Sequence, residues 1–521
     1  MARGFLHLPF EILSQICQTW CSHCDEESPG SAENAWVNSN VWSTKPTALA
    51  LGLDSDSRAR GEGGQLTLSR LSRTCKHLRA VAQPVLYHDF CTRHDKDLFL
   101  FVRTLLQRPD LCPRVQRISI SSSGSGWIYG ADDVGRFEHH ARHLGIPLSL
   151  PTQGLLTRTY PWPGGVTSPY LLRQGRSTFD QVDAVLMLQN LVQLLLPLIP
   201  HVKEAFILLR SSPRETDDTL HTSRQVVFHL PELTRLSFGP RAASRPSWFS
   251  QPDVLPVFFC PRLVFLHLRF CTESLHFGRE TMLDAGDRGD PLTLHTLPLQ
   301  HLTVLHITGC RVSRTFLQDL LGQVGPHLTT VAIVLGYLWN TETEGRLLPD
   351  DVTPGQVIES LLPWAETLRA VRIDLSRAMP RAVKLRKTDL ITSLSHFSRL
   401  EALELDLSCV YIAQLDGLLM FGVDTAQADW DMLVNLLPES IREFVLNGPT
   451  HRVYDALEEL SDRAASGRFS DLVEVSCDDG PVAHLEHLRD RFGIAGVNFS
   501  LRVPKYGLRK HGFTQSLSGL F

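Results

Sequence analysis

The most regular hydrophobic pattern in this sequence is a short apolar core that recurs along most of the chain. Each copy has apolar residues at its first, fourth and sixth positions, and successive copies start 26 to 41 residues apart, as from 302 to 328 and from 400 to 441. The alternation within a copy is typical of a half-buried strand, so the pattern predicts one strand per copy. The copies are Val202/Ala205/Ile207, Leu233/Leu236/Phe238, Leu263/Leu266/Leu268, Leu302/Leu305/Ile307, Leu328/Val331/Ile333, Leu368/Val371/Ile373, Leu400/Leu403/Leu405, Ile441/Phe444/Leu446 and a shorter Leu472/Val475.

Segments with helical spacing of apolar residues lie between the predicted strands. We expect helices near residues 316–324, 357–362, 390–397 and 453–460. Helices also end in Leu-Leu-Pro at 195–197, 361–363 and 436–438, where proline disfavours the helical conformation of the preceding residue. A strand and a helix with one apolar face each can bury both faces against the next copy. The pattern predicts an α/β solenoid, and a general α/β domain with several parallel strands is the alternative.

Two short amphipathic stretches precede this array. In the first, Leu8 and Pro9 come before apolar residues at helical spacing, which are Ile12, Leu13, Ile16, Cys17 and Trp20. In the second, the apolar residues are Leu68, Leu71, Cys75, Leu78 and Ala82, with Arg70, Arg73, Lys76 and Arg79 largely on the other side. We expect one helix around residues 8–20 and another around 68–82, each too short to be stable alone.

At these residues the chain resembles the F-box family. The segment Leu8-Pro9-x-Glu11-Ile12-Leu13-x-x-Ile16 looks like the start of an F-box, and Leu71-Ser72-x-Thr74-Cys75-x-x-Leu78 looks like its later helix. Residues 84–90 are similar to the exit of the box in fungal members. The resemblance implies docking on a Skp-type adaptor, through Leu8, Pro9, Glu11, Ile12, Leu13, Ile16, Leu71, Cys75 and Leu78. A small helical hairpin with a buried stripe is the alternative interpretation.

The array resembles degenerate leucine-rich repeats of the F-box type over residues 110–500. The asparagine or cysteine that usually follows the strand is mostly missing, although Cys271, Cys310 and Cys409 lie at similar positions. We therefore expect a helical F-box followed by an irregular leucine-rich-repeat solenoid. The expected domains are an F-box at 1–92 with a disordered insertion at 22–65, an array at 93–504 and a basic tail at 505–521.

Two long segments interrupt the predicted array, near 121–176 and 272–298. Insertions in a solenoid project from one face and often form a binding surface. The aromatic and proline-rich piece with Tyr160, Trp162 and Pro163 is accordingly the candidate for contact with a target protein. Packing of the same side chains against the array is the alternative.

Composition narrows the classes of partner. The 521 residues have a formal net charge of -5, which favours neither nucleic acid nor a membrane surface as a partner. Eleven scattered cysteines lack the dense spacing of a secreted disulfide framework, so we expect a reducing compartment, cytoplasmic or nuclear. The most apolar stretch, 182–199, contains polar residues and indicates a buried helix rather than a membrane span.

Few residues suggest chemistry. The spacing Cys17-x-x-x-Cys21-x-x-Cys24 is similar to the cluster motif of radical S-adenosylmethionine enzymes, but Cys17 belongs to the apolar face of a predicted helix. A zinc site from Cys21, His23 and Cys24 lacks a second ligand pair. His139, His140 and His143 lack the glutamate of a metalloprotease motif and indicate a polar surface. We predict no catalytic residue, no metal site and no cofactor.

The sequence thus predicts a non-catalytic subunit of a ubiquitin ligase. It would join a cullin scaffold through the Skp-type adaptor and bind an unknown target protein with its repeats. One alternative is a repeat-based interaction scaffold without a ligase role. A remote one is an iron–sulfur or metal enzyme that uses Cys17, Cys21 and Cys24.

Overall fold

The structure is a computed structural model of the 521-residue chain. It divides into two compact units, Met1–Val352 and Thr353–Phe521, which are described separately. The described residues are 8–21, 24, 55–92, 95–121, 131–143, 191–209, 226–240, 256–269, 299–310, 312–335, 352–375, 387–410, 431–448, 453–477 and 482–501. Tyr160, Trp162 and Pro163, the segment 272–298 and the basic tail at 505–521 lie outside them.

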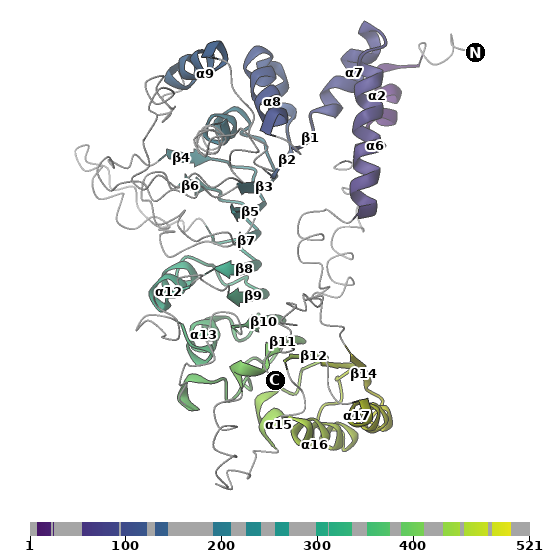
Figure 1. The fold of residues 1–521 in the computed structure, drawn as a ribbon, viewed down its shortest axis with the longest axis vertical. Helices are drawn as coiled ribbons and strands as arrows, with labels where there is room; N and C mark the ends of the chain where they lie inside the picture. The colour runs from purple at the N-terminus through teal and green to yellow at the C-terminus, as the bar shows by residue number, and fades with distance from the viewer. Residues whose placement is uncertain are drawn as a thin grey trace, which may run out of the picture. The chain divides into compact units, whose positions relative to one another are not determined.

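Three helices form the N-terminal part of the first unit and lie side by side in Figure 1: α2 (Phe10–Gln18), α6 (Ser55–Ser72) and α7 (Lys76–Leu86). The single helix expected over 68–82 is wrong, because the chain breaks between α6 and α7. Cys75 is extended, with φ -153°, and its sulfur accepts a hydrogen bond from the Leu78 N–H at 3.5 Å. A side chain that caps a helix start in this way competes with helix continuation. Helix α6 also includes 55–65, which we had assigned to the insertion.

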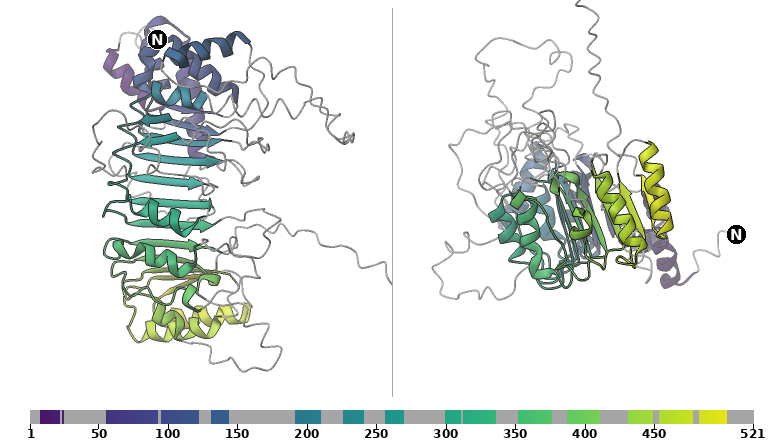
Figure 2. Two further views of the ribbon diagram at one scale, coloured as in Figure 1. Left: turned by 90° about the vertical axis from the view of Figure 1, so that its left-hand side faces the viewer. Right: turned by 90° about the horizontal axis from the view of Figure 1, so that it is seen from below.

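A parallel sheet follows the chain order in the first unit. Its strands are β1 (Asp89–Cys91), β2 (Arg117–Ser121), β3 (Glu204–Leu209), β5 (Arg235–Pro240), β7 (Phe265–Arg269), β8 (Val304–Cys310) and β9 (Thr330–Leu335). Each pairs in parallel with the next, and Figure 2 shows them side by side. A second sheet, which the sequence pattern did not predict, pairs β4 (Val226–His229) with β6 (Pro256–Phe259). The labelled helical segments of this part are α8 (Asp95–Gln107), η1 (Pro109–Arg114), α9 (Ala131–His143) and α12 (Arg314–Leu321), and residues 191–198 are helical as well.

The second unit has the same kind of order. Its strands β10 (Ala370–Asp374), β11 (Ala402–Asp406), β12 (Glu443–Asn447), β13 (Glu474–Cys477) and β14 (Asn498–Leu501) pair in parallel, one after the other. Its helical segments are α13 (Pro354–Leu361), η4 (Leu362–Trp364), η5 (Lys387–Asp389), η6 (Leu407–Cys409), α15 (Met432–Leu436), α16 (Tyr454–Ala465) and α17 (Val482–Ile494). The predicted α/β class with parallel strands is confirmed in both units.

The strand register aligns the predicted apolar positions. In the first unit the fourth residue of each copy forms one row, which is Ile118, Ala205, Leu236, Leu266, Leu305 and Val331. In the second unit the row is Val371, Leu403, Phe444, Val475 and Phe499. All members of both rows are buried, so each strand contributes the same position to the core.

The helix expected over 390–397 is wrong, although its apolar residues are buried as predicted. The backbone N–H of Ile391 donates to the Cys409 carbonyl, and that of Leu394 donates to the Leu436 carbonyl. Bonds to distant backbone replace the bonds that a helix would form within the segment. Burial of an apolar stripe therefore did not require helical conformation here.

No helix in the described ranges is long and apolar enough to cross a membrane. Of the apolar stretch 182–199, residues 182–190 lie outside the described residues, and residues 191–198 are helical.

Shortening one buried side chain of the apolar row is expected to destabilise the first unit. Leu305 is fully buried, with Leu266 and Val331 beside it in the row, so Leu305→Ala should lower the free energy of unfolding by about 2–5 kcal/mol. Val264→Ala, at a neighbouring and 38% exposed position, serves as the control and should cost less than about 1 kcal/mol. Urea unfolding followed by circular dichroism compares the two variants. Equal stability of both would contradict the assignment of the row to the core.

Candidate functional site

The first helix has apolar residues on two sides. One side packs into a hydrophobic cluster that contains Leu13 and Cys17 of α2, Leu68 of α6 and Leu78, Val81, Ala82 and Val85 of α7. Phe10, at the first position of the helix, is 49% exposed, and Ile12 is 41% exposed. A helix with apolar residues around its surface normally has neighbours around its surface. Within the described residues, α2 therefore has two large apolar side chains that its neighbours leave partly uncovered.

Leu66 of α6 adds a third large apolar residue and is 52% exposed. We use the name apolar patch for the three exposed apolar residues of these helices, Phe10, Ile12 and Leu66. Exposed basic side chains accompany it on the α6–α7 part of the fold: Arg70, Arg73, Lys76 and Arg79. Apolar side chains together with like-signed charges are suited to a partner that offers an apolar contact and acidic groups.

The predicted docking residues differ in exposure. Pro9, Glu11, Ile12 and Cys75 are exposed, whereas Leu8, Ile16 and Leu71 are half-buried. Leu13 and Leu78 are 1% and 7% exposed and belong to the core, where they support the patch from behind. Cys75 caps α7 and therefore has a structural role of its own.

Phe10 and Leu66 were missed by the sequence analysis. Phe10 lies three and seven residues before Leu13 and Cys17, so helical spacing assigns it to their buried stripe, yet as the first residue of α2 it is 49% exposed. Spacing alone therefore did not mark Phe10 as exposed. No signal marked Leu66 either, because its helix was predicted to begin later.

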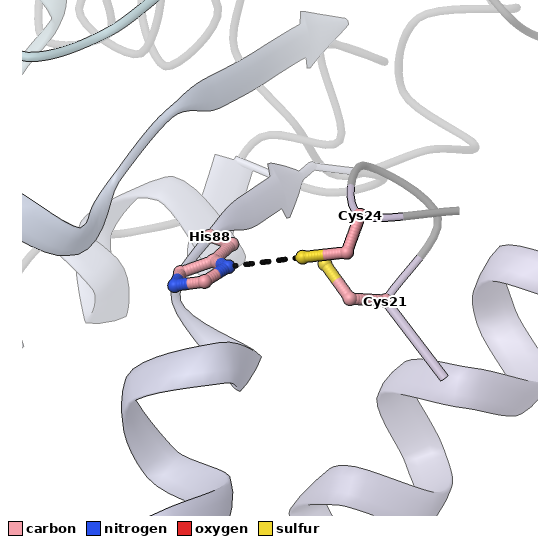
Figure 3. A group of neighbouring side chains, drawn as sticks. All are labelled: Cys21, Cys24 and His88. Atoms are coloured by element: carbon pink, nitrogen blue, oxygen red, sulfur yellow. Dashed lines mark hydrogen bonds between the residues drawn. The ribbon is translucent and has the colours of Figure 1, made fainter. Parts of the chain in front are cut away.

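A second cluster of chemistry-bearing side chains lies beyond the ends of α2 and α7, as Figure 3 shows. One ligand atom each from Cys21, Cys24 and His88 lies within 4.8 Å of the other two. The Cys24 sulfur is 3.5 Å from His88 Nδ1. Among the described residues this is the one group of three potential metal ligands. Its two cysteines were recognised in the sequence, but His88 is 64 residues away from Cys24 and only the fold brings it near.

Cys17 does not join this cluster. It is 3% exposed in the hydrophobic core, and burial raises the pKa of its thiol. The iron–sulfur interpretation required Cys17 with Cys21 and Cys24, and the structure gathers the last two with a histidine instead. His23, the other expected ligand, lies outside the described residues.

The histidines of α9 form no metal group with other described residues. His139 and His143 are exposed and their rings stack with centroids 6.3 Å apart. Partial burial, and the neighbouring His139 and His143, lower the pKa of His140. The arrangement agrees with the predicted polar helix surface.

Polar residues occupy the strand positions between the apolar rows. Glu204 pairs with Arg117 at 3.3 Å and with Arg235 at 3.2 Å, across β2, β3 and β5. In the second unit Glu404 is 3.2 Å from Arg372 and accepts a hydrogen bond from Asn447 Nδ2 at 2.9 Å. The parallel register places these partners on adjacent strands, so each unit has a polar row beside its apolar one.

His267 on β7 lies between Ser237 and Thr308, two residues further along the strands than the row of Glu204 and Arg235. The Ser237 hydroxyl is 3.3 Å from Nδ1 and the Thr308 hydroxyl is 2.8 Å from Nε2. Ser237 is 0% exposed, which prevents a substrate from reaching its hydroxyl in this conformation. The contacts are therefore structural, and they do not form a nucleophile with its base.

Two cysteines, Cys310 at the end of β8 and Cys409 in η6 after β11, bond back to the preceding strand. The Cys310 thiol donates to the Leu268 carbonyl at 3.6 Å, and the Cys409 thiol donates to the Ile373 carbonyl at 3.9 Å. Both cysteines are buried, and burial raises the pKa of Cys409 well above its usual value. The two thiols occupy equivalent places in two units; Cys271, the third such cysteine, lies outside the described residues.

No protein-family model matches the chain, and a comparison with curated proteins finds no match.

Acid is expected to destabilise the first unit through His267. Burial lowers the pKa of His267 well below its usual value, and the nearby His306 and Arg269 add to this effect. The unfolded chain takes up a proton near pH 6.5 whereas the folded chain does not, so stability is full above pH ~6.5 and falls below it. Thermal unfolding midpoints between pH 7.5 and 5 should show this loss.

His267→Asn should flatten this pH dependence, while His327→Asn, at an exposed position, should retain it. An unchanged slope in the His267 variant would show that other groups cause the acid sensitivity.

Proposed function

We propose that this chain is the substrate-recognition subunit of a Skp/cullin/F-box ubiquitin ligase. The N-terminal helices would dock on the Skp-type adaptor, and the strand-rich remainder would bind the target protein. The observation that carries the proposal is the exposure of Phe10 and Ile12 on a helix that packs Leu13 and Cys17 into the hydrophobic core.

The apolar patch supports docking by its energetics. Full burial of a Phe, Ile or Leu side chain contributes about 1.5–3 kcal/mol relative to exposure. Because Phe10, Ile12 and Leu66 are partly exposed, the isolated chain does not gain a large part of this burial free energy. Hydrophobic residues exposed together mark interaction sites on soluble proteins. The order of Leu8, Pro9 and Ile12, which resembles the start of an F-box, points to the Skp-type adaptor as the partner.

The basic residues favour the same partner chemistry. Arg73, Lys76 and Arg79 are exposed around the junction of α6 and α7. They would attract an acidic partner at long range and raise the association rate more than the final affinity. The adaptor surface that fits this chain is therefore apolar at its centre and acidic at its edge.

Regular strand order supports repeats of the leucine-rich type. The same turn precedes several strands: the backbone N–H of Leu233, Leu263 and Leu302 each donates to the carbonyl three residues earlier. Cys310 and Cys409 also form equivalent bonds to the preceding strand, as expected of residues that replace the repeat asparagine. A repeated turn and a repeated side-chain bond support one structural unit used many times.

The proposed receptor acts by proximity. It holds a target lysine near a charged conjugating enzyme and so raises the effective concentration of the two reactants. No side chain of this chain takes part in the chemical step under this proposal. The protein would work in the cytoplasm or nucleus, where the other ligase subunits operate.

Removal of the exposed apolar side chains is expected to weaken adaptor binding. Phe10→Ala with Ile12→Ala should raise the dissociation constant for a purified Skp-type adaptor by about 30-fold or more, because central apolar anchors dominate interface energies. The fold should persist, since both side chains are exposed. Isothermal titration calorimetry measures the constant, and the thermal midpoint reports the fold.

Ile494→Ala is the matched control, because Ile494 in α17 is 82% exposed and belongs to the second unit. It should bind the adaptor as the natural chain does. Absence of binding by the natural chain would overturn the proposal. A stable adaptor complex that recruits no cullin would instead favour the scaffold without a ligase role.

A further inference from the structure

We propose that Cys21, Cys24 and His88 bind a zinc ion that fastens the first helix to the start of the sheet. The proposal does not depend on the ligase function. It begins from the distances: the three ligand atoms lie within 4.8 Å of one another, with Cys24 Sγ 3.5 Å from His88 Nδ1. In a tetrahedral zinc site, with Zn–S of about 2.3 Å and Zn–N of about 2.0 Å, such a pair is separated by roughly 3.5 Å.

The ligand types select the metal. Two thiolates and one imidazole suit zinc and other borderline or soft metals, whereas Ca²⁺ and Mg²⁺ take oxygen ligands. Cys21 and Cys24 have the two-residue spacing that is common for zinc-binding cysteine pairs. Three protein ligands leave the fourth tetrahedral position for water or for a further ligand from the chain. Binding releases the protons of the two thiols, so affinity should fall as the pH is lowered.

Local packing holds both sides of the site. Cys21 is 3% exposed, and its backbone N–H donates to the Gln18 carbonyl at the end of α2. Gly64 of α6 lies against Trp20, the residue before Cys21. A Cβ added to Gly64 would be 2.0 Å from the Trp20 carbonyl oxygen. Only glycine allows this approach, which fixes the turn that carries Cys21.

His88 is held by the sheet. Its carbonyl accepts hydrogen bonds from the backbone N–H groups of Gln116 and Arg117, at 3.0 and 2.9 Å. Arg117 begins β2, and Asp89, directly after His88, begins β1. The imidazole therefore projects from the junction between α7 and the first strand pair, and Figure 3 shows it facing the two thiols.

A zinc ion at this place would offset the entropic cost of bringing distant parts of the chain together. Cys24 and His88 are 64 residues apart in the sequence, and closing so long a separation costs conformational entropy. A metal that binds only the folded chain adds its binding free energy to stability. The ion would also connect α2, which carries Phe10 and Ile12, to the first strands by metal–ligand bonds in addition to packing.

Metal content tests the proposal. The full chain, purified with a thiol reductant and supplied with one equivalent of zinc, should retain about one zinc per chain after gel filtration, as measured by mass spectrometry of the element. Cys24→Ser and His88→Gln should each lose it. Cobalt substitution should give the intense visible spectrum of a tetrahedral thiolate site. A chelator should lower the thermal midpoint of the natural chain and leave that of Cys24→Ser unchanged.

Cys17→Ala controls for general damage to the helices, because Cys17 is a neighbouring cysteine buried in the core. It should lose stability yet retain zinc. Absence of zinc from the natural chain, or equal zinc in the Cys24 and His88 variants, would overturn the proposal. A Cys21–Cys24 disulfide in the purified protein, with no zinc bound after its reduction, would overturn the proposal as well. A coloured iron cluster that is lost from Cys17→Ala would also overturn it.

Discussion

The rest of this fold depends on one constraint, the burial of an apolar row. Each strand contributes a residue to this row, and parallel pairing aligns the residues of neighbouring strands. Leu266, Leu305 and Val331 align in the first unit, and Leu403, Phe444 and Val475 align in the second. A shift of one residue in any strand would turn its apolar set to the other face. Side-chain burial thus sets the register of the strands, and the register decides which side chains meet across adjacent strands.

The polar row is a direct consequence of that register. Residues next to a buried position point to the opposite face of the sheet, and the same alignment brings Arg117, Glu204 and Arg235 together. His267 finds Ser237 and Thr308 for the same reason. Buried polar side chains are acceptable because partners on adjacent strands satisfy them. A change in one strand therefore affects the polar contacts of the next.

Strands were the most predictable part of the structure, because burial repeats at fixed positions and needs no knowledge of distant contacts. Helices were less predictable. Cys75 caps α7 and so interrupts the expected helix, and the Leu394 N–H donates to the Leu436 carbonyl instead of to a carbonyl within a helix. The candidate sites depended still more on the fold. Phe10 is exposed at the first position of α2 although its spacing groups it with the buried Leu13 and Cys17, and the place of His88 follows from the hydrogen bonds that join it to β2. Sequence spacing contains neither fact.

The central claim is that the exposed apolar residues of α2 dock on a Skp-type adaptor. Hydrogen–deuterium exchange of the full chain, with and without purified adaptor, tests both the binding and its place. The account predicts slower exchange in α2 and at the α6–α7 junction, with the strands of the second unit unchanged. Unaltered exchange in α2 at saturating adaptor, or protection confined to the strands, would contradict it.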